Sequence, residues 1–256
     1  MGIGGRATLE SDIRRKQCLA GRLRIAWKRH RGTPGNAIHP MTEQQAAYRG
    51  RTKYDSRTAE RYQVRKEGKH RAEMRLVERA FTLIPKGHRV LDVPCGGGRV
   101  TVHLAQRGYA MTCADLSEAM LAIARENVAR HGFQCPVERQ DIEKLTCGDR
   151  AFDTVVSFRL FHHFPNREIR QRAVTELCRV AGQFVALSYF SPASVTSVKR
   201  KIRVAMGGRR SDKHPTPLSE VRGYFEKAGF RLVKDFAQLP LVHTLHLAVF
   251  ERTKGN

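Results

Sequence analysis

Along residues 88–190, hydrophobic residues follow two patterns in turn: short continuous runs, and positions spaced by three or four residues. Apolar runs such as 88–93 and 152–158 have the length of buried strands. Between such runs, apolar residues recur every three or four positions, as Val100 and Leu104 do, which is the period of a helix. Strands that alternate with helices build a mostly parallel sheet. The sequence therefore predicts an α/β, doubly wound fold with helices on both faces of the sheet.

The other predicted elements follow the same two patterns. Further strands are expected at 109–114, 134–139, 183–189, 231–238 and 244–250. Further helices are expected at 117–132, 170–180 and 218–230. Before the first strand, the spacing of Met74, Val77, Ala80 and Phe81 predicts a helix within residues 42–81.

Composition is that of a globular chain, with 256 residues, 41% hydrophobic and 28% charged. No run approaches the roughly 18 apolar residues of a membrane-spanning helix, which argues against an integral membrane protein. We expect a basic arm at 1–40, a helical cap at 41–85, and a main domain at 86–256 with an insertion at 191–217.

Charge is far from balanced, with a formal net charge of +23. Such a surface attracts polyanions, including RNA, DNA and anionic lipid headgroups. Residues 1–75 hold nineteen Lys and Arg against seven Asp and Glu. Three explanations fit residues 1–40: a disordered basic tail, an Arg-rich targeting peptide, or a true start of translation at Met41.

The insertion at 191–217 holds seven Lys and Arg against one Asp. Val198, Ile202 and Ala205 recur at helical spacing among these cations, which predicts a basic amphipathic helix. One interpretation is a lid that meets an anionic substrate or a membrane surface. The other is an ordinary solvated helix.

The six cysteines show neither a C-x-x-C pair nor the spacing of a zinc site. We therefore expect small buried thiols, a reducing cytoplasmic location and no structural metal.

Carboxylates and glycines follow the predicted strands. Asp92 is followed by Gly96 and Gly98, and Asp115 and Asp141 end the next two strands. Ligands of doubly wound sheets bind beyond these strand ends. The phosphate-binding pattern G-x-x-x-x-G-K-[ST] is missing and G-x-G-x-x-G is incomplete. Three acids without a loop lysine suit a ligand with ribose, adenine and positive charge but no phosphate.

Four segments in order resemble motifs of the class I S-adenosylmethionine-dependent methyltransferases, and the fourth is similar to that of the ubiquinone- and menaquinone-biosynthesis methyltransferases and related small-molecule enzymes. They are Val90–Arg99, Cys113–Leu121, Gln140–Ile142 and Phe152–Phe164. The resemblance implies a Rossmann-like sheet of seven strands with an antiparallel last strand. It also implies S-adenosylmethionine as the cofactor.

The resemblance further implies which residues hold the cofactor. They are Asp92, Pro94, Gly96, Gly98, Asp115, Leu116, Asp141, Ile142, Ser157, Phe158 and Arg159. Pro94 departs from the family pattern, which has a glycine there. Lys69, His70 and Arg71, on the helix before the first motif, are further candidates for holding the cofactor's carboxylate, and Arg159 could instead grip a substrate anion.

Methyl transfer needs alignment of donor and acceptor, and a base only if the acceptor keeps its proton. His162 and His163 are candidates for that base, and Tyr189 for orienting the acceptor. The chain lacks an Asn/Asp-Pro-Pro-Tyr/Phe segment and a Pro-Cys pair at the relevant positions, which disfavours the common base-amine and cytosine-carbon classes. We therefore expect a small or lipid-like acceptor that is methylated at oxygen or carbon. The basic insertion and arm would hold the protein at an anionic membrane surface. An RNA methyltransferase and a non-catalytic binding protein are the alternatives.

Overall fold

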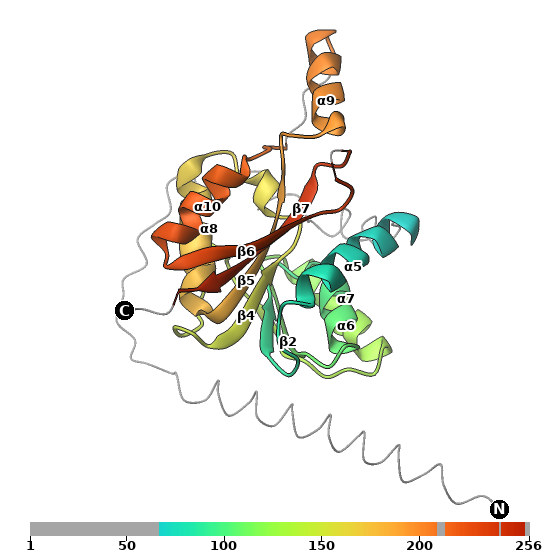
Figure 1. Ribbon diagram of the computed structural model, residues 1–256. Helices are drawn as coiled ribbons and strands as arrows, with labels where there is room; N and C mark the ends of the chain where they lie inside the picture. Colours follow the sequence, from blue (N-terminus) through green and yellow to red (C-terminus); the bar gives the residue numbers. More distant parts are fainter. Residues whose placement is uncertain (1–66, 209–212, 241, 254–256) are drawn as a thin grey trace, which may run out of the picture. The chain divides into compact units, whose positions relative to one another are not determined.

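One mixed sheet organises the part of the chain that the computed structural model describes, which is residues 67–208, 213–240 and 242–253 (Figure 1). The predicted arm at 1–40 and residues 41–66 of the predicted cap lie outside these ranges. The strand order is β3-β2-β1-β4-β5-β7-β6. The strands are β1 (Arg89–Asp92), β2 (Ala110–Asp115), β3 (Val137–Arg139), β4 (Phe152–Ser157), β5 (Ala181–Phe190), β6 (Phe230–Ala237) and β7 (Leu245–Arg252).

Strand direction agrees with the sequence prediction. The first five strands are parallel, and β7 pairs antiparallel with both β5 and β6. Because β1 is paired with β2 and β4, Asp92 lies opposite Cys113 on one side and Val156 on the other. The carboxyl ends of β1, β2 and β4 therefore meet at one edge of the sheet. The predicted seven-stranded, doubly wound fold is confirmed.

Helices cover both faces of this sheet (Figure 1). On one face lie α5 (Glu67–Phe81), α6 (Arg99–Ala105) and α7 (Glu118–Arg130). On the other lie α8 (Arg167–Val180) and α10 (Leu218–Lys227). A short turn, η1 (Phe161–His163), follows β4, and α9 (Val195–Ala205) follows β5.

Side-chain caps define where two of the helices begin. The hydroxyl of Ser117 accepts the Met120 N–H, as the sequence predicts for α7. In α8, the Asn166 side chain accepts the Ile169 N–H, so the helix begins at Arg167 and not at Arg170, where the sequence prediction placed it. The prediction was late by one turn because it followed the apolar spacing and not the Asn cap.

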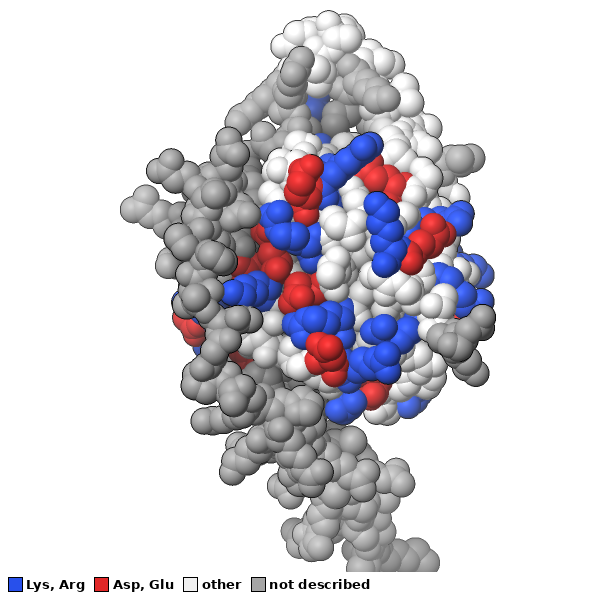
Figure 2. All heavy atoms as spheres, turned by 90° about the vertical axis from the view of Figure 1, so that its left-hand side faces the viewer, with Lys and Arg blue, Asp and Glu red and all other residues white. Residues whose placement is uncertain are grey.

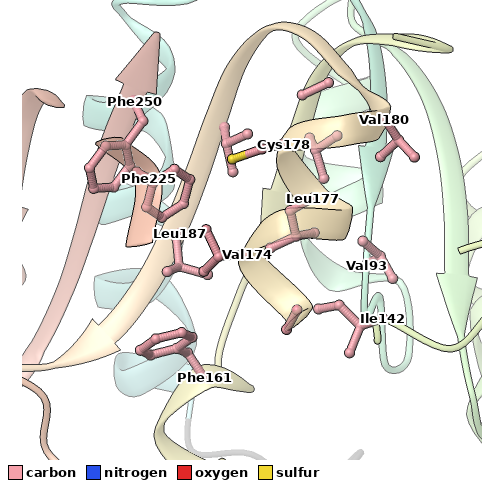
Figure 3. Close-up of a cluster of buried hydrophobic side chains, with 14 of the residues drawn as sticks. Val93, Ile142, Phe161, Val174, Leu177, Cys178, Val180, Leu187, Phe225 and Phe250 are labelled. Carbon is pink, nitrogen blue, oxygen red and sulfur yellow. The ribbon is translucent and has the colours of Figure 1, made fainter. Parts of the chain in front are cut away.

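The core on the α8 and α10 face is shown in Figure 3. Phe225 of α10 and Phe250 of β7 stack with parallel rings 3.7 Å apart. Leu177 and Val174 of α8 pack in the same cluster, as does Leu187 of β5. This packing buries the apolar stripe of α8 against the sheet and fixes the strands whose ends carry the polar site.

The core on the opposite face holds α5 in place. The four residues whose spacing predicted this helix, Met74, Val77, Ala80 and Phe81, are all buried. The Tyr109 hydroxyl donates to the carbonyl oxygens of Phe81 and Ile84, which satisfies the end of the helix. The helix prediction is confirmed for α5.

Figure 2 turns the side of the molecule that carries α8 and α10 toward the viewer, with basic and acidic side chains next to one another. Ion pairs join them, for example Arg170 with Glu220 at 2.8 Å and Arg172 with Glu143 at 2.7 Å. The positive charge of this face is therefore partly balanced locally.

The cysteines within the described ranges carry no disulfide, and four of the five are buried. Among these residues, no cluster of three or more His, Cys, Asp or Glu side chains is arranged to hold a metal ion. Within the same ranges, every helix is too short or too polar to cross a membrane.

Candidate functional site

Four polar residues predicted for the site lie at neighbouring strand ends. Asp92 is the last residue of β1, Asp115 the last of β2 and Ser157 the last of β4, while Asp141 lies two residues after β3. Since these strands are parallel neighbours, their carboxyl ends share one edge of the sheet. The structure thus brings together residues that span 65 positions of the sequence.

A glycine turn connects β1 to α6 beneath this edge. Gly96 and Gly98 have positive φ angles of 53° and 74°. A Cβ atom on Gly98 would lie 3.4 Å from both the Cα and the Cβ of Ala124 in α7. Glycine is therefore needed at position 98 both for its backbone conformation and for close packing of the turn. Pro94 lies half-buried at the start of the turn.

Asp115 holds the glycine turn from the neighbouring strand. Its Oδ2 accepts the Gly96 N–H at 2.9 Å and its Oδ1 accepts the Ser117 N–H at 2.9 Å. Burial raises the pKa of Asp115, and these backbone hydrogen bonds counteract the rise. Each carboxylate oxygen retains a further acceptor position. Leu116 follows, half-buried, at the same strand end.

Asp92 is completely buried beside Asp115. Its Oδ2 accepts the Thr101 hydroxyl at 2.7 Å, and Thr101 Oγ1 in turn accepts from the Cys113 thiol at 3.2 Å. Its Oδ1 makes no hydrogen bond among the described residues. Burial raises the pKa of Asp92 well above its ordinary value, and Cys113 and Asp115 raise it further. A cation next to Oδ1 would stabilise the ionised form.

Asp141 and Ile142 flank the edge beyond β3. The Oδ1 of Asp141 accepts the Glu143 N–H at 3.0 Å, and Ile142 is buried in the core. On the other side, Ser157 and Phe158 are buried at the end of β4. The predicted adenine segment and the predicted fourth-strand segment thus stand at the same edge as the two acids.

Arg159, which follows Phe158, is held by contacts that the sequence prediction missed. Its backbone has a φ of 69°, its N–H donates to Ser188 Oγ, and its guanidinium donates to Glu73 Oε1 at 2.9 Å. Glu73 of α5 is fully buried and also accepts from Arg99 at 3.3 Å. One signal was present in the sequence: Glu73 precedes Val77 by four residues and so belongs to the apolar side of the helix.

Of the three residues of α5 that were candidates for holding the cofactor's carboxylate, Arg71 is exposed on the surface of the helix. Nothing in its position tests the expectation that it binds the cofactor's carboxylate, and this role stays a prediction. Lys69 and His70 lie one turn before Glu73, with the His70 ring 3.0 Å from an Arg99 nitrogen.

The three predicted catalytic residues do not lie on one face. His162 and His163 form η1 beyond β4, and both are buried. The His162 ring stacks on Phe190 of β5. Because alternate strand residues point to opposite faces, Tyr189 points away from this stack, and its hydroxyl donates to Asp235 Oδ2 at 3.0 Å. The structure therefore brings the two histidines together and places Tyr189 elsewhere.

Comparison with known proteins shows to which family a chain with this fold and these strand-end residues belongs. Residues 90–183 match a protein family described as "Methyltransferase domain". The malonyl-[acyl-carrier protein] O-methyltransferase of Geobacter sulfurreducens is 30% identical over 204 residues, which are 75% of this chain and 70% of that protein. The chain belongs to the class I S-adenosylmethionine-dependent methyltransferases.

Other methyltransferases align over shorter or more divergent stretches. The ubiquinone biosynthesis O-methyltransferase of Coxiella burnetii is 31% identical over 110 residues, which are 43% of this chain. This alignment spans about half the relative's length, 46%. The magnesium protoporphyrin IX methyltransferase of Synechocystis is similar in structure, with a TM-score of 0.60, 19% identity and coverage of 94% of this chain and 100% of that one. At that identity the likeness concerns the fold alone.

The residues at the strand ends of this methyltransferase fit S-adenosylmethionine. The buried Oδ1 of Asp92, which makes no hydrogen bond among the described residues, suits the positive charge of the cofactor's methionine part. The carboxylate of Asp115 suits the two ribose hydroxyls. The glycine turn leaves its backbone open to close approach of a ligand because no Cβ projects from it.

Proposed function

We propose that the protein transfers the methyl group of S-adenosylmethionine to an oxygen or carbon atom of a small or lipid-like acceptor. The observation that carries the proposal is the position of His162 and His163 at the sheet edge that Asp92 and Asp115 also occupy. When bound, the cofactor supplies a methyl group activated by a sulfonium centre. Two of the relatives above are named O-methyltransferases, which supports an oxygen acceptor.

The histidines are held in a way that suits proton transfer. The His214 N–H donates to the His162 carbonyl at 2.8 Å, and the His163 N–H donates to the Leu160 carbonyl at 2.8 Å. Stacking on Phe190 fixes the plane of the His162 ring. An imidazole, with a pKa of about 6.5 in water, can take the proton of a phenol at neutral pH. Burial of the turn also keeps water away from the reacting atoms.

The test is transfer of a labelled methyl group to catechols with alkyl chains of increasing length. We expect His162→Gln or His163→Gln to lower the rate by about 10²-fold or more, because a general base contributes that much. His131→Gln, at the exposed end of α7, is the matched control and should keep the wild-type rate. Full activity in both variants would contradict the role of the histidines as base, and no transfer to any catechol would contradict a phenolic oxygen as the acceptor.

A membrane surface as the place of reaction is supported by α9. Six of the seven exposed large hydrophobic side chains among the described residues lie on α9, directly after it, or in the β6–β7 loop. They are Val195, Val198, Ile202, Met206, Leu239 and Val242. The N–H and hydroxyl of Thr196 both donate to the Val242 carbonyl, so the helix and the loop form one apolar surface.

Charge around this apolar surface favours anionic lipid. Residues 195–205 contain four Lys and Arg and no Asp or Glu. The cations Lys199 and Arg203 are exposed on the helix that carries Val198 and Ile202. Helices with an apolar side and a basic side bind at the interface of anionic membranes. Since α9 follows β5, it begins at the sheet edge that carries the site (Figure 1).

We expect the protein to sediment with phosphatidylglycerol vesicles and not with phosphatidylcholine vesicles. The double variant Ile202→Glu, Met206→Glu should weaken this binding about 10-fold or more, because two apolar contacts are lost and two negative charges are added. Val233→Glu alters an exposed valine on β6 that is not part of the apolar surface formed by α9 and the β6–β7 loop, and it is the matched control. Binding that is equal for all three proteins would contradict the membrane role. Salt-sensitive binding to structured RNA without vesicle binding would instead favour the RNA methyltransferase.

A further inference from the structure

Three of the five cysteines in the described ranges lie together beside the strand ends that carry Asp92 and Asp115. Cys95 belongs to the glycine turn after β1, Cys113 to β2, and Cys135 lies two residues before β3. Cys95 and Cys113 are members of one buried apolar cluster, and Cys135 packs against it. The Sγ atoms of Cys113 and Cys135 are 4.0 Å apart, which is direct contact. The fold thus brings together two thiols that are 22 positions apart in the sequence.

The backbone around this pair is anchored on one side and free on the other. Cys113 pairs with Val137 in the β2–β3 ladder, and its N–H donates to the Pro136 carbonyl at 2.8 Å. Cys135 lies outside the ladder, and its own N–H and carbonyl make no hydrogen bond among the described residues. A disulfide has about 2.05 Å between its sulfur atoms, so the two sulfurs would have to approach by about 2 Å. Residue 135 can supply this movement because its backbone is not tied to the sheet.

Access to the pair is from the side of Cys135. Cys135 is half-buried, whereas Cys95 and Cys113 are buried. A small oxidant therefore meets the Cys135 sulfur first. A hydrogen bond with Cys113 and burial raise the pKa of Cys135, so little of the reactive thiolate is present at neutral pH. We expect the oxidation to take hours in millimolar peroxide, as in prolonged oxidative stress.

A chain of hydrogen bonds joins this pair to the cofactor site. The Cys113 thiol donates to Thr101 Oγ1 at 3.2 Å, and the Thr101 hydroxyl donates to Asp92 Oδ2 at 2.7 Å. All three residues are buried. If the Cys113 sulfur bonds to Cys135, it loses its proton and with it the hydrogen bond to Thr101. A buried acceptor without its donor is destabilised, so the Thr101 hydroxyl and the Asp92 carboxylate that it holds change position.

We propose that Cys113 and Cys135 are a redox-modification site, at which hydrogen peroxide forms a disulfide that weakens cofactor binding. The Cys135 sulfur attacks one peroxide oxygen: an S–O bond forms, the O–O bond breaks, and the departing hydroxide takes the thiol proton as water. The Cys113 sulfur then attacks the sulfenic acid: the S–S bond forms, the S–O bond breaks, and the hydroxide leaves with the Cys113 proton as a second water. The two thiols together give two electrons to one peroxide.

This inference goes beyond the proposed function, because it concerns control of the methyl donor and not the acceptor. The test is treatment of the full chain with millimolar hydrogen peroxide, followed by peptide mass mapping and by calorimetric titration of S-adenosylhomocysteine. We expect a cross-linked peptide pair that contains Cys113 and Cys135. Affinity should fall about 10-fold, the effect of one lost hydrogen bond. Dithiothreitol should remove the cross-link by thiol–disulfide exchange and restore the affinity.

Two variants separate this pair from other oxidisable groups. Cys135→Ser should form no cross-link and should bind S-adenosylhomocysteine equally well before and after peroxide, and Cys135→Ala provides a second variant if it does not fold. Cys147→Ala removes a buried thiol elsewhere and is the matched control, which should respond to peroxide as wild type does.

Three results would overturn the inference. They are oxidation of Cys135 to the sulfinic acid without a cross-link, a mapped cross-link that leaves the affinity unchanged, and an equal loss of affinity in Cys135→Ser. The cross-link is mapped in the absence of cofactor, so this result is independent of the proposed function. Reduced wild-type protein that binds no S-adenosylhomocysteine would overturn the methyltransferase function, and the mapped peptides would still decide whether the pair is a redox site.

Discussion

Replacement of Asp115 by alanine is expected to weaken the binding of S-adenosylhomocysteine by about 10²- to 10⁴-fold. The carboxylate is the only acid at the end of β2, and each hydrogen bond to a charged group contributes about 1.5–3 kcal/mol. Two ribose hydroxyls lose their acceptor in the variant, and every 1.4 kcal/mol is a factor of ten. Calorimetric titration of S-adenosylhomocysteine into both proteins measures the difference.

Asp149→Ala is the matched control for this experiment. Asp149 is an exposed acid before β4 that pairs with Arg179, and its loss should leave cofactor affinity unchanged. Asp115→Asn retains an acceptor oxygen, so its affinity for S-adenosylhomocysteine should lie between those of wild type and Asp115→Ala. A folded Asp115→Ala protein with wild-type affinity would contradict the assignment of Asp115. A folded wild type that binds no S-adenosylhomocysteine would favour the non-catalytic binding protein.

The largest expected loss of stability follows from replacing Glu73 by alanine. Glu73 is fully buried between Arg99 and Arg159, whose side chains are 17% and 15% exposed. Removal of one partner from a buried ionic cluster costs about 3–5 kcal/mol, because the remaining charges stay desolvated. For a chain of this size that corresponds to a fall in melting temperature of roughly 6–20 °C. Thermal unfolding followed by circular dichroism measures it.

A second acid on α5 is also ion-paired but is exposed, so its replacement shows how much of the stability loss is due to burial. Glu78 pairs with Arg107 at 2.8 Å but is 48% exposed, so Glu78→Ala should cost less than about 1 kcal/mol. Glu73→Gln keeps the shape of the side chain and removes the charge, and should still be clearly destabilised. If Glu73→Ala and Glu78→Ala unfold at the same temperature, the cluster does not hold α5 against the sheet.

Local signals in the sequence were sufficient to predict the residues on the cofactor side of the site. Acids at strand ends and glycines at positive φ, such as Asp92, Asp115 and Gly98, belong to short segments whose pattern is complete within a few residues. The strand order then follows from parallel connections, so the acids must meet at one edge. For this reason both the fold and the grouping of these residues could be predicted.

The acceptor side depends on contacts between distant segments, and the sequence predicted less of it. Glu73 and Arg159 are 86 positions apart, and no spacing rule relates them. Lys213 lies in a connecting segment without a period, so nothing in the sequence indicated that its ammonium lies over the Phe190 ring. The period of α9 predicted an apolar side, but periodicity cannot say whether that side packs inward. In the structure Ile202 is exposed.

The place of β7 in the sheet has a consequence for how the chain acquires its fold during synthesis. β7 is inserted between β5 and β6, although it follows both of them in the sequence. Arg252, at its end, donates to the carbonyl oxygens of Cys178, Ala181 and Gly182, which closes the junction between α8 and β5. A ribosome releases a chain from the amino end at about 5–20 residues per second. In the finished sheet β6 is paired with β7, so β6 lacks this neighbour until residues 245–252 emerge, and the β6–β7 edge of the sheet is completed last.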